Sequence, residues 1–168
     1  MKKQLILLVL TIMVSITTQG QNFVFIGESS YPSTEQYSLE SNSDKENIND
    51  LKLVFAKEGE KALIVVSSKL TDVVKIAEKL IIYLDDGTVI SCVDRGMNDT
   101  VDDIAITAYY LTTSELSKLM SSNINTIRYE IVCQVCGPFN SWEGTYSASN
   151  KESSKTDFTK IVAEFNNE

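Results

Sequence analysis

Three groups of side chains in this sequence have types and spacings that could support chemistry. One is a pair of adjacent aspartates between two apolar runs, one is a pair of cysteines three positions apart, and one is a loop that mixes aromatic rings with amides. These groups would serve carboxylate catalysis, thiol-redox or metal chemistry, and ligand binding, respectively. Their residues are Asp85 and Asp86, Cys133 and Cys136, and the segment 137–147.

The absence of histidine from the 168 residues restricts the catalytic options. Ser-His and Cys-His nucleophilic pairs, histidine-ligated zinc and imidazole pH switches all require that side chain. A hydrolase would instead need two carboxylates, one of them desolvated so that its pKa rises. A glycan hydrolase of that kind holds two carboxyl groups about 5–10 Å apart in a cleft. The candidates are Asp85, Asp86, Asp94 and Asp103.

The adjacent aspartates are better explained as a turn. Residues 80–84 and 89–93 are apolar runs with strand character, and Asp86-Gly87 is a preferred pair for a two-residue hairpin turn, whose central positions both need positive φ. A hairpin tip is normally solvated, so both carboxylates are expected to stay ionised. Neighbouring side chains also point to opposite faces of a strand, which disfavours a shared site.

One acidic segment offers the oxygen atoms that calcium prefers. The candidates are Asp94, Asn98, Asp99 and Asp102, but their spacing does not match the EF-hand loop and no bidentate glutamate closes it. We therefore expect a solvated loop, and no metal or other cofactor. The same segment contains an Asn-X-Thr sequon. Thr100 also fits a short O-glycosylation signal of some Bacteroidota-type bacteria, in which Asp precedes Ser or Thr and an apolar residue follows.

The chain has three cysteines, Cys92, Cys133 and Cys136. Redox-active pairs with this spacing lie at a helix N-terminus, which lowers the thiol pKa, whereas Cys133 and Cys136 lie at the end of a predicted strand. Disulfides persist in the oxidising compartments outside the cytosol, so export makes a structural disulfide plausible. Both Cys92–Cys133 and Cys133–Cys136 are possible pairings. The odd count leaves one thiol unpaired. We predict inert thiols or one structural bridge, with a thiol-redox or metal role for Cys133 and Cys136 as the alternative.

The loop at 137–147 is the candidate binding surface. It carries Phe139, Trp142 and Tyr146 among glycine, serine and asparagine residues. Exposed aromatic rings beside amides can stack on a sugar ring or contact a protein partner. Large rings in loops also fold back onto a core, and tryptophan is highly buried on average. The binding hypothesis therefore depends on these rings being accessible.

The first twenty residues have the pattern of a secretory signal peptide. Lys2 and Lys3 precede an uncharged, largely apolar run at 5–16, which is shorter than the roughly 20 residues that cross a bilayer. Small residues at the −3 and −1 positions fit cleavage before Gln21. We expect export to the periplasm or the extracellular space, without stable membrane insertion.

The charge balance narrows the class of partner. Fifteen basic and 23 acidic residues give a net charge of −8, and loss of a signal peptide would remove two further lysines. Nucleic acids and anionic membrane surfaces are bound through clustered lysine and arginine. We therefore expect no nucleic-acid partner, and the remaining partner classes are a protein or a glycan.

The apolar pattern predicts a single mainly β (α+β) domain over residues 21–168. Alternating runs such as 104–111 and 124–135 indicate strands, and residues 71–79 fit either a strand or a helix, with β-branched residues favouring a strand. Two helices are expected, at 111–123 with a Thr-Glu capping box and at 156–165. These elements predict an antiparallel sheet or sandwich of about six to eight strands with two packed helices.

Several stretches resemble short secreted proteins of Bacteroidota-type bacteria, a group with no established activity. The cleavage region "TTQGQN" is similar to exported proteins of those bacteria, and so are "FVFIGESSYPS", "LIIYLDDGTVISCVDRG" and "YYLTTSELSKLMSSNINTIRY". The resemblance implies export and a β-rich fold, and transfers no catalytic residue. The sequence thus predicts an exported, non-enzymatic binding domain, with a carboxylate-dependent glycan hydrolase as the alternative enzyme.

Overall fold

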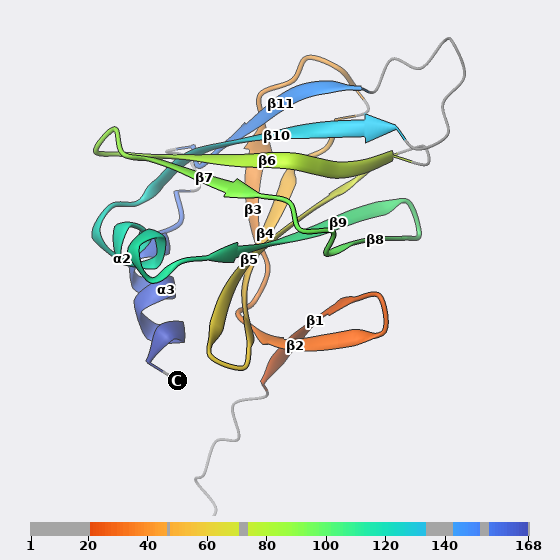
Figure 1. Cartoon of the computed structure of the whole chain (residues 1–168). Coiled ribbons are helices and arrows are strands. Elements are labelled where there is room, and N and C mark those ends of the chain that lie inside the picture. The colour runs from red at the N-terminus through yellow and green to blue at the C-terminus, as the bar shows by residue number, and fades with distance from the viewer. Residues whose placement is uncertain (1–20, 47, 71–73, 134–142, 152–154, 168) are drawn as a thin grey trace, which may run out of the picture.

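The computed structural model describes residues 21–46, 48–70, 74–133, 143–151 and 155–167. These residues form an antiparallel sheet that curls around an apolar interior, with two helices side by side at one end (Figure 1). The elements in chain order are β1 (Asn22–Ile26), β2 (Ser29–Ser33), β3 (Tyr37–Ser41), β4 (Leu51–Glu58), β5 (Lys61–Lys69), β6 (Val74–Leu84), β7 (Val89–Val93), β8 (Asn98–Val101), β9 (Ile104–Leu111), α2 (Thr113–Ser121), β10 (Ile124–Cys133), β11 (Gly144–Ser149) and α3 (Phe158–Asn166).

Nine of the strands form one continuous path, in the order β7-β6-β10-β11-β3-β4-β5-β9-β8, and the β1–β2 hairpin joins it through β4. The path bends back on itself, so that β6 and β7 at one end contact β9 near the other end. Across this approach the Thr107 hydroxyl of β9 donates to the backbone oxygen of Ile76 in β6. The sheet is therefore a half-barrel.

The prediction of a mainly β protein with an antiparallel sheet and two packed helices is confirmed. The expected number of six to eight strands and the sandwich alternative are wrong. The described chain forms one curled sheet of 11 strands. The additional strands are short and polar, such as β2 with Pro32 and the acidic β8. Such strands are held by pairing with a neighbour and lack the apolar alternation that reveals a half-buried strand in a sequence. Residues 74–79 belong to the strand β6, which is the alternative that the β-branched residues in this stretch favour over a helix.

Two apolar clusters lie on opposite faces of the sheet. The larger fills the inside of the half-barrel and includes the fully buried Phe55 and Tyr129. The smaller lies on the outer face of β4, β5 and β9, where Ile26 of β1 packs with Val54 and Leu63. The β1–β2 hairpin thus covers the outer face of one half of the sheet.

The helices form where the sequence predicts them, with α2 starting at the expected capping box. The Thr112 hydroxyl accepts the Glu115 amide at 3.2 Å, and the Glu115 carboxylate accepts the Thr112 amide at 2.8 Å. Asn123, just after α2, fixes the start of α3, because its side-chain oxygen accepts the Phe158 amide at 2.9 Å. The Phe158 ring then packs edge-on against Tyr37, with 5.6 Å between ring centroids. These contacts join both helices to the open end of the half-barrel.

Candidate functional site

A polar hollow of about 340 Å³ opens where β3 leaves its neighbour β11. The two strands pair only through Glu40 and Ser41 of β3, after which the chain turns away towards β4. The first half of β11 is consequently paired with β10 alone. The walls of the hollow come from residues 42–45, from Arg128 on β10 and from residues 143–147.

Lys45 and Tyr146 form one wall of the hollow. The Lys45 ammonium donates to the Tyr146 hydroxyl at 3.0 Å and lies 5.3 Å from the centroid of the same ring. The Tyr146 side chain is only 8% exposed, because its ring packs into the main core beside Tyr129. Tyr146 therefore presents its hydroxyl group to the hollow, while its ring contacts Tyr129 and Lys45.

A ladder of polar side chains continues from the hollow over β11. The Asn42 side-chain amide donates to the hydroxyls of Ser147 at 3.1 Å and Ser149 at 2.8 Å. The Asn42 backbone amide also donates to the Ser147 carbonyl at 2.9 Å. Thr126 on β10 extends the ladder, with 2.9 Å between its hydroxyl oxygen and that of Ser149. These bonds hold the 42–45 connection against the sheet and fix the orientation of the hydroxyl groups.

Arg128 and Glu143 are the remaining charged groups of the hollow. Arg128 is exposed and lies directly across from Ser147 in the β10–β11 register. Among the described residues its guanidinium has no ion pair. The Glu143 carboxylate accepts the Cys133 backbone amide at 3.1 Å, so this carboxylate has a structural partner. The hollow therefore presents a guanidinium beside hydroxyl and amide groups.

The predicted binding residues divide between described and undescribed parts of the chain. Phe139 and Trp142 lie outside the described residues. Tyr146 lines the hollow, as do residues 143–145 at the end of the predicted loop. Sequence reasoning missed Asn42, Lys45 and Arg128. No local signal identifies them, because they meet β11 only through strand pairing between distant segments.

Asp85 and Asp86 form a hairpin turn, although its type differs from the prediction. Only Gly87 has a positive φ, 85°, whereas a two-residue type I′ turn would need two positive values. The Gly87 amide donates to the Leu84 carbonyl at 3.0 Å, and the Leu84 amide donates to the Thr88 carbonyl at 2.9 Å. The tip is therefore a three-residue loop with glycine at the left-handed position.

The environment of both turn aspartates favours the ionised form. The Lys155 ammonium, 2.9 Å away, and the Asn125 amide lower the pKa of Asp85. The Thr88 amide, which donates to the Asp86 carboxylate at 2.8 Å, lowers the pKa of Asp86. A general acid at neutral pH needs the opposite shift. Neither residue is suited to that role.

The other carboxylates proposed for hydrolysis lie away from this turn. The Asp103 carbonyl accepts the Leu70 amide at 2.7 Å in the β8–β9 turn, at the end of the sheet opposite the β6–β7 tip (Figure 1). Asp94 accepts the Gly96 amide at 2.7 Å, and its own amide bonds the Glu78 carbonyl. The turn aspartates and Asp103 therefore share no cleft.

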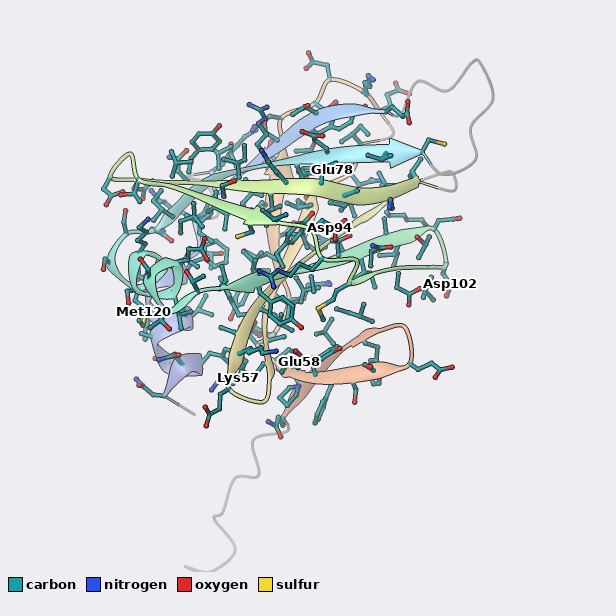
Figure 2. All side chains as sticks on the ribbon, in the orientation of Figure 1. Lys57, Glu58, Glu78, Asp94, Asp102 and Met120 are labelled. Atoms are coloured by element: carbon teal, nitrogen blue, oxygen red, sulfur yellow. The ribbon has the colours of Figure 1, made fainter. Side chains whose placement is uncertain are left out.

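The four residues proposed as calcium ligands lie in different local structures and do not converge on one point. Asp99 accepts the Gly27 amide at 2.9 Å with one oxygen and the Thr100 amide at 2.8 Å with the other. Asp94 and Asp102 lie apart (Figure 2), and Asp102 has a left-handed backbone with φ 50°. Asn98 pairs with Thr107 in the β8–β9 ladder. Within the described ranges, no group of three or more metal-binding side chains occurs.

The cysteines take different states. Cys133 is disulfide-bonded, whereas Cys92 is a free thiol on β7. Cys92 is 2% exposed, and its burial raises the pKa of the thiol to about 12. The alternative Cys92–Cys133 bridge is therefore not formed. Cys136 lies outside the described residues.

Comparison with protein-family models, curated proteins and solved structures finds no match to this chain. The proposed signal peptide at 1–20 lies outside the described residues. No helix among the residues described here is both long and apolar enough to span a bilayer.

Proposed function

We propose that this protein is an exported, non-enzymatic domain that binds a carboxylate-bearing glycan in the hollow between β10, β11 and residues 42–45. The observation that carries the proposal is the chemistry of that hollow of about 340 Å³, which is lined by residues with hydroxyl, amide and guanidinium groups. Ligand pockets commonly measure about 300–1,000 Å³. The hollow lies at the small end of that range and suits a short segment of a glycan chain.

The polar lining favours a glycan over a protein partner. The centre of a protein interface is usually apolar or aromatic, with polar groups at the rim. Here Asn42, Thr145 and Ser147 line the hollow itself. Such groups both donate and accept hydrogen bonds, which matches the hydroxyls of a sugar. Asn42 and Ser147 are also held by bonds to each other, so little side-chain freedom is lost on binding.

The charges of the hollow favour an acidic sugar. Lys45 and Arg128 contribute two positive charges, and Glu143 contributes one negative charge. This balance contrasts with the net charge of −8 for the whole chain. A guanidinium can hold a carboxylate through two parallel hydrogen bonds. A uronate ring placed with its carboxylate at Arg128 would also bring its hydroxyls to Ser147 on the adjacent strand.

A binding role is supported over the hydrolase and thiol-redox alternatives. The lowered pKa values of Asp85 and Asp86 disfavour either residue as the proton donor that glycoside cleavage needs. The thiol-redox alternative concerns Cys133 and Cys136. Cys133 is disulfide-bonded, as a structural bridge requires, and has no free thiolate in that state.

The experiment is a binding assay against oligogalacturonate and alginate oligosaccharides, with neutral cello-oligosaccharides as the comparison ligands. We expect the protein to bind at least one acidic series and not the neutral series. Arg128→Ala should weaken that binding by at least about tenfold, the effect of losing one charge-assisted bond. Lys79→Ala removes an exposed cation from β6 outside the hollow and is the matched control. Equal losses in both variants, or no binding to either acidic series, would overturn the proposal.

Export is tested separately by the intact mass of protein recovered from outside the cytoplasm. We expect a mass that lacks residues 1–20, with Gln21 as the first residue. A full-length chain confined to the cytoplasm would contradict export and leave the glycan assay unaffected.

A further inference from the structure

We propose that two copies of this chain pair antiparallel through the free edge of β1, with the twofold axis at Val24. This interface does not depend on the proposed glycan site. Among the described residues, β1 pairs only with β2, so its other edge is open. An open strand edge presents unpaired amide and carbonyl groups that can accept another strand.

The hairpin register determines which groups point to that edge. Gly27 and Glu28 form a two-residue turn, so the flanking pair Ile26 and Ser29 exchanges both backbone hydrogen bonds. Bonded and non-bonded pairs alternate along an antiparallel ladder. Phe25 and Phe23 therefore occupy the non-bonded positions, and their amide and carbonyl groups face away from β2.

The identity of residue 32 agrees with this assignment. The partner of Phe23 on β2 is Pro32, which has no amide hydrogen to donate. Proline is accepted at a non-bonded position and would remove a ladder bond at a bonded one. The free edge of β1 thus presents two donors and two acceptors, from Phe23 and Phe25.

The sequence of β1 is self-complementary about Val24. In an antiparallel pair centred on Val24, Phe23 of one copy lies opposite Phe25 of the other. Both positions have outward-facing backbone groups, so four hydrogen bonds form across the twofold axis. The two side chains of each pair lie on the same face of the new ladder, and aromatic cross-strand pairs stabilise sheets. The same twofold operation creates two such Phe–Phe pairs.

The exposure of β1 is otherwise unexplained. Phe23 is 50% exposed and Phe25 is 65% exposed, while Val24 and Ile26 on the opposite face pack onto the second apolar cluster. Natural edge strands are commonly protected by charges, proline or a bulge. β1, with sequence NFVFI, has none of these protections.

The other ends of the sheet fit a second copy less well. β8 is four residues long, and its Asp99 would repel a copy of itself. β7 is uncharged, but it contacts β9 at the place where the half-barrel bends back. β1 is therefore the edge best suited to a second copy, and a twofold pair leaves no further β1 edge for growth.

Sedimentation velocity at about 5 to 500 µM, a range suited to a small interface of weak affinity, tests the dimer. We expect the wild-type protein to shift from monomer to dimer with concentration. The double variant Phe23→Lys with Phe25→Lys places like charges opposite each other and should remain monomeric. The double variant Phe23→Lys with Phe25→Glu places opposite charges across the twofold axis and should recover the dimer. Val89→Lys, at a 49% exposed position on β7, is the control that should dimerise as the wild type does.

The charge-swapped variant distinguishes this register from others. If Phe23 faced Phe23 of the second copy, the Lys–Glu variant would place like charges together and stay monomeric. A monomeric wild-type protein, or loss of the dimer in Val89→Lys alone, would overturn the proposal. Circular dichroism spectra unchanged from the wild type would show that the variants are folded.

Discussion

The Lys45 ammonium lies 3.0 Å from the Tyr146 hydroxyl and 5.3 Å from the centre of its ring, although 101 positions separate the two residues. Tyr146 belongs to the paired strand β11, and Lys45 belongs to the connection after β3. This contact therefore fixes an irregular segment against a rigid one. It determines the shape of one wall of the hollow.

A double-mutant cycle with Tyr146→Phe and Lys45→Met should measure that contact. Tyr146→Phe keeps the ring in the core and removes only the hydroxyl, while Lys45→Met keeps most of the aliphatic chain. We expect a coupling free energy of about 1 kcal/mol from urea unfolding, which is typical of a hydrogen bond with a nearby charge–ring contact. Additive effects of the two substitutions would show that the pair contributes no coupling.

Removing either of two buried phenol hydroxyls should leave the protein equally stable or more stable. Among the described residues, the hydroxyls of Tyr109 and Tyr129 have no hydrogen-bond partner, and both side chains are fully buried. An unsatisfied buried polar group costs about 1–3 kcal/mol. Tyr109→Phe and Tyr129→Phe should therefore raise the free energy of unfolding or leave it unchanged. A loss above about 1 kcal/mol would reveal a hydrogen bond or water-mediated contact at that hydroxyl.

Phe158 should be the main anchor of α3. Its side chain is fully buried and meets the Tyr37 and Phe55 rings at centroid distances of 5.6 and 6.2 Å. Phe158→Ala should lower the free energy of unfolding by about 3–5 kcal/mol, the usual cost of a large cavity. Phe165→Ala is the matched comparison on the same helix, because its ring is only partly buried, and its effect should be smaller. Equal losses would contradict this assignment.

The ion pair between Asp85 and Lys155 should make the protein less stable as the pH falls. The pKa of Asp85 is lowered in the folded protein. At pH values above the ordinary pKa of 3.8, the ionised carboxylate therefore stabilises the fold. That contribution is lost as the pH falls through the lower pKa of the folded state. Asp85→Asn should melt below the wild type at pH 7, and the two melting temperatures should converge as the pH falls below 3.8.

Asp157→Asn provides a comparison for that experiment, at a carboxylate that caps a helix and has no ion pair among the described residues. Asp157 also has a lowered pKa, caused by its bonds to Thr159 and Lys160 at the N-terminus of α3. Asparagine is an equally good N-cap residue, so this substitution should cost little stability at pH 7. Because the pKa of Asp157 is also lowered, any difference from the wild type should likewise shrink as the pH falls. A difference between wild type and Asp85→Asn that stays constant from pH 7 to pH 2 would refute the role of the ion pair.

The sequence predicted those elements whose signals are local. The capping box of Thr112 and Glu115 marks the start of α2, and apolar spacing identifies α3. The turn at Gly87 was located correctly, but its three-residue form was not, because loop length depends on which strand residues pair. Pairing is a tertiary property, and a shift of one residue moves every side chain to the other face.

The hollow could not be predicted for the same reason. Its lining depends on β3 leaving β11 after Ser41, which brings Asn42 to Ser147 across 105 positions. Neither segment has a distinctive motif, and residues 41–50 have the composition of an ordinary surface loop. Residues 143–147, at the end of the predicted binding loop, line the hollow.

The most direct test of the binding proposal is a two-dimensional amide NMR titration of the labelled protein with oligogalacturonate and, in parallel, with an alginate oligosaccharide. We expect saturable shifts for at least one of the two ligands at residues 42–45, Arg128 and residues 143–147, with the β6–β7 tip unchanged. The same titration of Arg128→Ala should give smaller shifts at the same positions. An unchanged spectrum with both ligands, or saturable shifts confined to another surface, would contradict the proposal that this hollow binds an acidic glycan.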